Sequence, residues 1–308
     1  MAAYRILALD GGGIKGLFTA RVLDRIVQQY PKLLKNVDLL AGTSTGGIIA
    51  LALAAGKTPG EIAKLYSERG EKIFDDSIWD DLIDLGNAVG ADYHLTGLRR
   101  ELKREFGGLK LGELDKKVVV PSFDLDSPED EAEGRPRMWK PKFFHNFPGS
   151  DSDGGEPVLD VALRTGAAPT YFPSHQGYID GGVVANNPSM AALAQALDKR
   201  AANRELGDLL LLSVSTGTEP KYIRGKSLDW GWGQWARPLI DLMMSGVMGV
   251  AHYQCRRLLG DRYFRVDTYF DRGVNMDDPR PKTLSYLEDQ AGKLDLDAVL
   301  DWLETNKW

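Results

Sequence analysis

A serine flanked by small residues is the first candidate for chemistry in this sequence. Residues 42–46 read GTSTG between two apolar runs, VDLLA before them and GIIALAL after them. If a strand turns sharply into a helix here, Ser44 is exposed above the sheet, and Gly42 and Gly46 remove the Cβ atoms that would collide at the corner. The positive end of the helix would favour negative charge at the serine. The pattern predicts a nucleophile, although an inert Gly/Ser/Thr turn has the same composition.

A glycine-rich loop follows the first apolar run. Residues 10–16 read DGGGIKG, so Gly11, Gly13 and Gly16 also satisfy the dinucleotide-binding pattern GxGxxG. Asp38 lies at roughly the right distance for a ribose contact, but at the start of the second predicted strand. The ribose-binding acid belongs near the C-terminal end of that strand. A nucleotide-binding module is therefore the alternative from another functional class.

The same loop could instead present backbone amides to an oxyanion. Loops that follow adjacent parallel strands lie side by side at the carboxyl edge of the sheet, where ligands of open α/β sheets bind. The amides of Gly12 and Gly13 would then face a carbonyl group attacked by Ser44. Loss of one such donor typically costs about 3 kcal/mol of transition-state stabilisation. Lys15 could steady the loop or add positive potential, and a solvated lysine in a first helical turn would look the same.

A serine nucleophile needs a base to take its proton. The chain has four histidines, His94, His145, His175 and His252. A triad in the α/β-hydrolase order Ser…Asp…His would need the late His252. That residue lies inside a continuous helical pattern at 243–259, whereas the histidine of such a triad normally sits on a loop.

Asp180 is the better candidate for the base. A short apolar strand delivers it to a turn formed by Gly181 and Gly182, where another backbone can approach closely. An Asp-Gly turn that only holds itself together through its own side chain is the competing interpretation.

Four blocks of this sequence together resemble the signature blocks of patatin-like phospholipases. They are DGGGIKG at 10–16, GTSTGG at 42–47, AAPTYFP at 167–173 and DGG at 180–182, in the order and spacing of that family. The resemblance covers residues 4 to about 215 and weakens from about residue 220. It implies a Ser44–Asp180 dyad, an oxyanion hole from Gly11, Gly12 and Gly13, and neither a catalytic histidine nor a metal or other cofactor.

The resemblance also implies an activity and supporting residues. We expect a lipid acyl hydrolase, a phospholipase A or carboxylic ester hydrolase, that forms an acyl-Ser44 intermediate and lets Asp180 activate water. A transacylase, in which an alcohol replaces water, would use the same groups, and a catalytically dead lipid-binding protein is a third possibility. Supporting roles fall to Gly42, Gly46, Gly181, Gly182 and Lys15, a position where the family admits Arg or Lys.

Apolar patterns place these motifs in alternating strands and helices. Residues 4–9 and 37–41 are apolar almost throughout, as in strands covered on both faces, while 17–30 and 46–55 carry helical patterns. This order predicts parallel neighbouring strands joined by right-handed crossovers. Further strands are predicted at 117–124, 142–146, 178–180, 209–215 and 263–269, and further helices after Asn187 and near the C-terminus.

The expected fold class is therefore α/β, and the resemblance implies a three-layer α/β/α arrangement with a mainly parallel central sheet. We expect one acyl hydrolase domain over residues 1–308. Its core would span residues 4–215, and residues 216–308 would form a packed extension where specificity is least predictable.

Composition limits the partners and the location. The chain has 308 residues, 43% hydrophobic and 27% charged, with a net charge of −6 that argues against nucleic acid as the main partner. Its one cysteine, Cys255, excludes an intramolecular disulfide and fits a reducing compartment. No signal-peptide pattern, bilayer-spanning stretch or EF-hand spacing is present. We expect a cytoplasmic protein that contacts membranes transiently, with phospholipid or glycerolipid as substrate.

Two segments are candidates for the contact with lipid. Residues 228–235 read LDWGWGQW, and the three indoles from Trp230 to Trp235 suit a membrane–water interface, although they could equally pack in the core. The neighbouring Met243, Met244 and Met248 could line an adaptable acyl channel. Residues 73–93 are a second candidate, for a lid.

Overall fold

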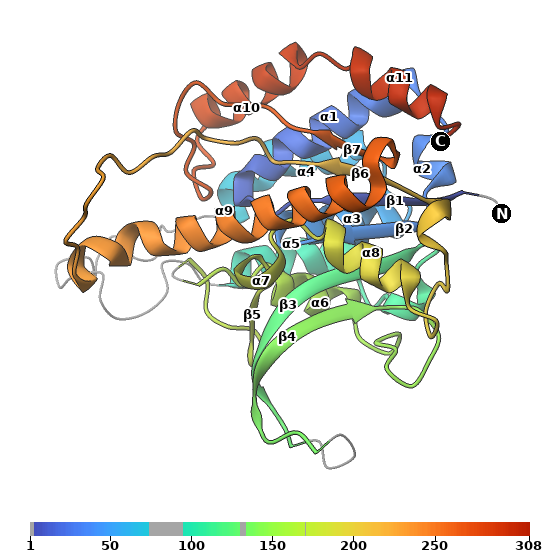
Figure 1. Ribbon diagram of the computed structural model, residues 1–308, viewed down its shortest axis with the longest axis horizontal. Helices are drawn as coiled ribbons and strands as arrows, with labels where there is room; N and C mark the ends of the chain where they lie inside the picture. The colour runs from blue at the N-terminus through green and yellow to red at the C-terminus, as the bar shows by residue number, and fades with distance from the viewer. Residues whose placement is uncertain (1–2, 74–94, 130–133, 170) are drawn as a thin grey trace.

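The computed structural model describes residues 3–73, 95–129, 134–169 and 171–308 (Figure 1). Within these residues a seven-stranded sheet has the order β4-β3-β2-β1-β6-β7, with β5 paired to β3. Neighbours from β3 to β7 along this order are parallel, while β4 and β5 run antiparallel to β3. The strands are β1 (Tyr4–Leu9), β2 (Leu39–Gly42), β3 (Lys117–Ser127), β4 (Met138–His145), β5 (Tyr178–Asp180), β6 (Leu209–Val214) and β7 (Tyr263–Val266).

The central strand β1 explains why the sheet is covered on both faces. Successive side chains of a strand point to opposite faces. Leu7 and Leu9 belong to one buried hydrophobic cluster, whereas Ile6 and Ala8 belong to another. Both faces of β1 are therefore apolar, and helices must cover each of them.

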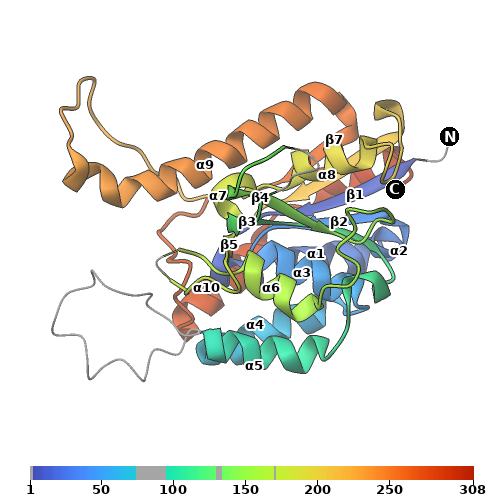
Figure 2. The same cartoon turned by 90° about the horizontal axis from the view of Figure 1, so that it is seen from below.

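Helices form a layer on each face of the sheet (Figure 2). The layer that shares the cluster of Leu7 contains α1 (Gly16–Gln29), α2 (Leu33–Asn36), α3 (Thr45–Ala54), α4 (Pro59–Ile73), α5 (Leu95–Phe106), α6 (Val158–Thr165), α10 (Pro281–Lys293) and α11 (Asp297–Thr305). The other layer contains α8 (Ser189–Leu197) and the C-terminal part of α9 (Trp232–Leu259), where Cys255 is fully buried. The short α7 (Gly182–Ala185) follows β5. The predicted three-layer α/β/α fold with a mainly parallel sheet is confirmed.

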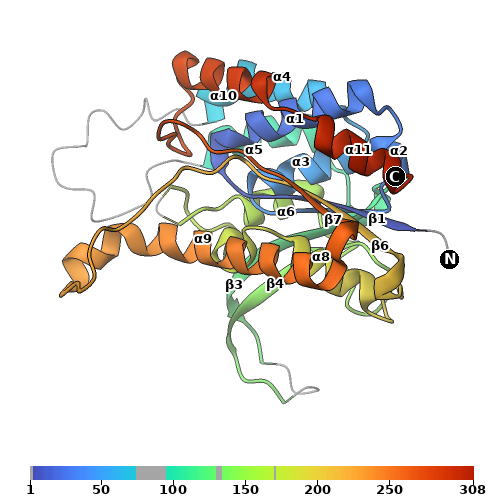
Figure 3. The same cartoon turned by 45° about the horizontal axis from the view of Figure 1, so that its top comes forward.

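The helix α9 is longer than its apolar pattern indicates. It begins at Trp232, not near residue 243, and it contains Pro238. The glycines and the proline in this stretch disfavour a helix locally, so the sequence predicts a helical pattern only from residue 243. In the structure, the N-terminal half of α9 extends beyond the end of the sheet (Figure 3). Trp232 is 85% exposed there, so the interpretation of this indole as a core residue is wrong.

Residues beyond 215 pack onto the same sheet and the same hydrophobic cluster as the N-terminal part. β7 pairs in parallel with β6, and Leu287 of α10 and Leu303 of α11 lie in the cluster that contains Leu7. The indole of the C-terminal Trp308 is buried and donates to the Leu33 carbonyl oxygen at 3.1 Å. Among the described residues, no helix combines the length and the apolar composition that a membrane span requires.

Candidate active site

Ser44 occupies the sharp corner between β2 and α3. Its backbone has φ 54° and ψ −125°, and residues other than glycine rarely adopt a positive φ. The corner is crowded, because a Cβ on Gly42 would lie 2.1 Å from the Gly46 carbonyl oxygen, and one on Gly46 would lie 2.3 Å from that of Leu9. Only glycine fits on either side, so the GTSTG pattern follows from close backbone approach around the serine.

Two threonines hold this corner in place. The Ser44 amide donates to Thr165 Oγ1 at 2.9 Å, and that hydroxyl donates to the Pro121 carbonyl oxygen at 2.6 Å. The Thr43 hydroxyl donates to the Ala185 carbonyl oxygen, also at 2.6 Å. Hydrogen bonds to β3 and α7 therefore fix the strained backbone from both sides. Thr165 carries no motif and was not predicted.

Asp180 ends β5, and its side chain reaches the serine. The pairing of Asp180 with Ser122 of β3 carries the carboxyl group to the edge of the sheet where β2 ends, and the residue is only 2% exposed. Its Oδ1 accepts the Gly182 amide at 2.6 Å, and the Ser44 side chain lies close enough to lower the pKa of the carboxyl group. Burial raises the pKa of the Asp180 carboxyl to about 6, and the interactions with Ser44 and with the Gly182 amide oppose part of that rise.

The glycine-rich loop lies beside this pair. The amide of Gly11 donates to the Asn186 carbonyl oxygen at 3.0 Å, so it is not available to an oxyanion, contrary to our expectation for this residue. The amides of Gly12 and Gly13 have no hydrogen-bond acceptor among the described residues, and both glycines line the cavity next to Ser44. Of the three predicted donors, the amides of Gly12 and Gly13 remain candidates.

Residues from the last third of the chain support the glycine-rich loop. The Thr216 hydroxyl donates to the Gly11 carbonyl oxygen at 3.0 Å, and the Ile14 amide donates to the Met276 carbonyl oxygen at 2.7 Å. Ile14 belongs to the short 3₁₀ helix η1 (Gly13–Lys15) that leads into α1. The loop is therefore held between β6 and the segment before α10.

Two ion pairs anchor the charged residues at either end of this loop. Arg265 Nη2 of β7 lies 2.6 Å from Asp10 Oδ2, and Arg265 also donates to Ser213 Oγ at 2.8 Å. The Asp10 side chain is fully buried and that of Arg265 is 8% exposed. Lys15 pairs with Glu219 at 3.4 Å, each side chain being 12% exposed. Lys15 is therefore a buried anchor of the loop and not a solvated lysine.

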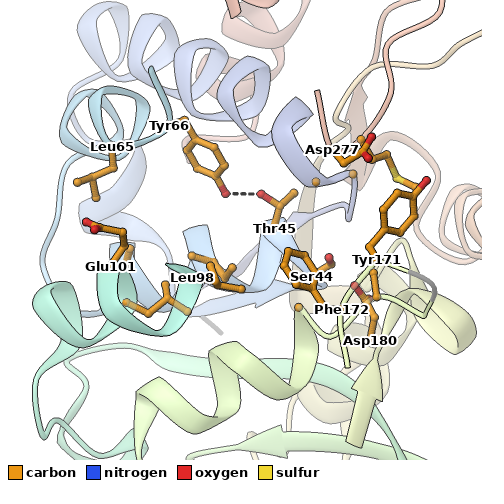
Figure 4. Close-up of a pocket in the computed structure, with 18 of the residues that line it drawn as sticks. Ser44, Thr45, Leu65, Tyr66, Leu98, Glu101, Tyr171, Phe172, Asp180 and Asp277 are labelled. Atoms are coloured by element: carbon orange, nitrogen blue, oxygen red, sulfur yellow. Dashed lines mark hydrogen bonds between the residues drawn. The ribbon is translucent and has the colours of Figure 1, made fainter. Parts of the chain in front are cut away.

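A cavity of about 350 Å³ opens beside these groups (Figure 4). Its polar end is formed by Ser44, Asp180, the Gly12–Gly13 backbone and Tyr171, while its other walls are mostly apolar side chains of α3, α4 and α5. The arrangement brings a hydroxyl, a buried carboxylate and two unpaired amides to one end of an apolar cavity. These are the groups that acyl transfer from an ester with a long apolar chain requires.

The comparison with known proteins agrees with this chemistry. A model of the patatin-like phospholipase family matches residues 7–193. The chain belongs to this family. It is therefore an enzyme of the phospholipase and esterase type, a lipid acyl hydrolase that acts on a lipid substrate.

Relatives of this patatin-like phospholipase span most of its length. CotR of Bacillus subtilis is 32% identical and covers 99% of both chains. A cGAMP-activated phospholipase of Pseudomonas aeruginosa is 33% identical over 86% of this chain and 78% of its own. Among solved structures, VipD from Legionella pneumophila covers 98% of this chain and 67% of its own at 13% identity, with a TM-score of 0.47.

The histidines in the described part of the chain do not line the phospholipase cavity. His252 Nδ1 lies 3.1 Å from the Tyr263 hydroxyl oxygen, on the face of the sheet that α9 covers, and burial lowers the pKa of its imidazole. His175 pairs with Asp160 at 3.0 Å. Neither these two nor His145 is among the described residues that line the cavity, and His94 lies outside the described part of the chain.

The geometry also weakens the nucleotide-binding alternative. Asp38 precedes β2, and its Oδ2 accepts the amide of Arg5, near the N-terminal end of β1, at 2.8 Å. The glycine-rich loop follows the C-terminal end of β1. The acid and the loop therefore lie at opposite edges of the sheet, too far apart for one ribose and its phosphates. In the described part of the chain, no group of three or more His, Cys, Asp or Glu side chains could hold a metal ion.

The predicted lipid contacts are only partly located in the cavity. Of the three methionines, Met244 lines it, whereas Met243 is 55% exposed and Met248 is not part of its wall. The rings of Trp230 and Trp235 contact each other, with centroids 5.0 Å apart, near the N-terminus of α9. The predicted lid at 73–93 lies outside the described residues except for its first residue.

Proposed function

We propose that this patatin-like phospholipase cleaves acyl ester bonds of phospholipids or related glycerolipids with Ser44 as nucleophile and Asp180 as base. One observation carries the proposal: a strained, positive-φ serine and a buried carboxyl group lie together at the polar end of an apolar cavity. A serine held in this way is aimed at a substrate carbonyl group, and the carboxylate is in position to accept its proton.

In the first step, Ser44 Oγ attacks the ester carbonyl carbon while its proton passes to Asp180. The negative charge that develops on the carbonyl oxygen is stabilised by the amides of Gly12 and Gly13. The C–O bond to the alcohol then breaks, and the alcohol leaves with the proton from Asp180. The acyl group remains on Ser44 as an ester.

In the second step, water attacks the acyl-Ser44 carbonyl carbon and gives a proton to Asp180. The tetrahedral intermediate collapses, the proton returns to Ser44 Oγ, and the fatty acid is released. A carboxyl group with a pKa of about 6 suits both roles, because it is mostly ionised at neutral pH yet more basic than an exposed aspartate.

The test of this proposal is turnover of a panel of diacyl phospholipids and glycerolipids by the wild type and by Ser44→Ala. We expect fatty acid release by the wild type and none by a folded Ser44→Ala variant. Retained turnover in that variant would overturn the nucleophile. Addition of a labelled alcohol separates hydrolysis from transacylation, because a transacylase yields the labelled ester in place of the free acid.

Contact with a lipid surface is proposed for the N-terminal end of α9 and the segment before it. Residues 220–241 carry four Lys or Arg and two Asp in a chain whose net charge is −6. Arg224 and Lys226 are exposed, as is the indole of Trp232. Basic side chains next to an exposed tryptophan favour the surface of an anionic bilayer.

Vesicle flotation with phosphatidylglycerol tests this surface contact. We expect Trp232→Ala to weaken binding, and added salt to weaken it further. Trp139→Ala is the matched control, because this indole is 68% exposed on β4, far along the chain from α9. Equal binding by the two variants and the wild type would overturn the contact.

A further inference from the structure

The cavity continues from Ser44 between three helices. Each helix turns one stripe of side chains toward it, with the three- and four-residue spacing of a single helical face. The stripes are Thr45, Ile48 and Ala52 of α3, Ile62, Leu65 and Tyr66 of α4, and Leu98, Leu102 and Phe106 of α5. The Thr45 and Tyr66 hydroxyls bond to each other, which leaves the rest of these walls apolar.

The length of this channel can be estimated from the helical rise of α3, which forms one of its walls. That helix begins directly after Ser44, and Ala52 lies eight residues further along the same wall. At a rise of about 1.5 Å per residue, the channel reaches about 12 Å from the serine. An extended hydrocarbon chain with bonds of about 1.5 Å advances roughly 1.3 Å per carbon, so about ten acyl carbons fit.

The far end of the channel is closed by charges. Lys57 Nζ lies 2.7 Å from Glu105 Oε2, and Arg69 Nη1 lies 3.0 Å from Glu105 Oε1 and 3.1 Å from Glu101 Oε2. These four residues, which we call the ion-pair cluster, all line the cavity. Figure 4 shows Glu101 at the end of the cavity away from Ser44. A methyl group pushed into paired charges would remove their water without replacing it, so longer chains are disfavoured.

The opposite end of the cavity is polar and suits the rest of the substrate. Tyr171 and Asp277 lie there, on the far side of Ser44 from the channel (Figure 4). A glycerolipid bound with its ester carbonyl at Ser44 therefore has its glycerol and head group at this end and its acyl chain between α3, α4 and α5. The reverse orientation would place polar groups against leucine and isoleucine.

We infer that the channel between α3, α4 and α5 takes one unbranched acyl chain of about ten carbons, and that the ion-pair cluster of Lys57, Arg69, Glu101 and Glu105 sets its upper length. The inference rests on the proposed function, because it takes Ser44 as the residue that is acylated. It adds the chain-length class of the substrate and the residues that determine it.

Hydrolysis of para-nitrophenyl esters from hexanoate to stearate tests the inference. We expect kcat/KM to be highest near decanoate and at least about tenfold lower for palmitate. Ala52→Phe should shorten the channel and move the optimum to shorter esters. Lys57→Met/Glu105→Leu removes one cation and one anion and leaves Arg69 paired with Glu101, so the ratio of palmitate to decanoate should rise about tenfold or more.

Lys64→Met/Glu68→Leu is the matched control for the double variant. This pair on α4 lies 3.6 Å apart with side chains 67% and 57% exposed, and it is not part of the cavity wall. Its chain-length profile should equal that of the wild type. A flat wild-type profile, or an optimum that neither Ala52→Phe nor the cluster variant moves, would overturn the channel while leaving the proposed function intact. Failure to hydrolyse any ester would overturn both.

Discussion

The two parts of the chain contribute to the site in different ways. Residues 7–193, which the family model matches, contain Ser44, Asp180 and the glycine-rich loop. The remaining third contains neither Ser44 nor Asp180, but it holds the loop in place through Thr216, Arg265 and the Met276 carbonyl oxygen. One part carries the proposed reacting groups, and the other supplies many of the contacts that support them.

The difference has a physical cause. A nucleophile at a crowded corner must be a particular residue between glycines, so its surroundings form a recognisable motif. Support requires only an acceptor or a counter-charge at the right place, and a backbone carbonyl group such as that of Met276 meets the need with any side chain. The predictions below test how strictly the two parts divide these roles.

The largest expected effect comes from a substitution at the contact between the two parts. A Cβ on Gly12 would lie 2.3 Å from Thr216 Oγ1, although its φ of 168° is one that any residue adopts. Gly12→Ala should therefore displace the loop amides and lower kcat by about 10²- to 10³-fold in a folded protein. In Gly108→Ala, the control, the added Cβ meets nothing within 4 Å. Equal kcat values for both variants would show that the loop amides do not act.

Removing the buried arginine of the C-terminal part should mainly affect stability. Arg265→Met leaves the fully buried Asp10 without its cation, which should lower the free energy of unfolding by about 3–5 kcal/mol. Arg280→Met breaks a pair in which the arginine is 78% exposed, and should lower the stability much less. Denaturant titration measures both. Equal losses would mean that the C-terminal part does not support the loop through this pair.

The pH dependence of kcat/KM tests Asp180, the proposed base in the N-terminal part. Since burial raises the pKa of Asp180 to about 6, kcat/KM should fall with a single protonation as the pH drops through 6. The native state also holds this proton more tightly than the unfolded chain. The protonated carboxyl group therefore stabilises the folded state by about 3 kcal/mol. This stabilisation is complete below the ordinary pKa of 3.8 and is lost as the pH rises through 6.

Asp180→Asn provides the matching stability measurement. The variant should gain stability relative to the wild type at pH 8, where the wild-type carboxylate is buried and charged, and this gain should shrink as the pH falls toward 4. Thermal unfolding at several pH values measures the difference. A gain that does not change with pH would mean that the Asp180 carboxyl titrates normally.

Much of this site could be predicted from the sequence because its motifs encode backbone geometry. The alternation of buried strands and amphipathic helices predicted the parallel sheet, and the elbow glycines predicted a corner that has no room for a Cβ. The occupation of the Gly11 amide could not be predicted, because its acceptor is the carbonyl oxygen of Asn186, and a carbonyl group has no sequence signature.

The supporting residues and α9 were harder to predict. Thr165 and Met276 act through a hydroxyl and a carbonyl group that many sequences offer. Among these supporting residues, Arg265 is the one that the sequence could have indicated, because a charged residue inside an apolar strand needs a buried partner of opposite charge. The start of α9 at Trp232 overrides the local preference of glycine and proline, so a helix in this N-terminal half was not expected.

The central claim is that Ser44 is activated by Asp180, and labelling with a fluorophosphonate ester followed by peptide mass spectrometry tests it most directly. The account predicts modification of Ser44 in the wild type, nearly complete loss of labelling in Asp180→Asn, and unchanged labelling in His252→Ala, whose imidazole contacts Tyr263 and not the cavity. Labelling of another residue, or equal labelling of Ser44 in the wild type and Asp180→Asn, would contradict it.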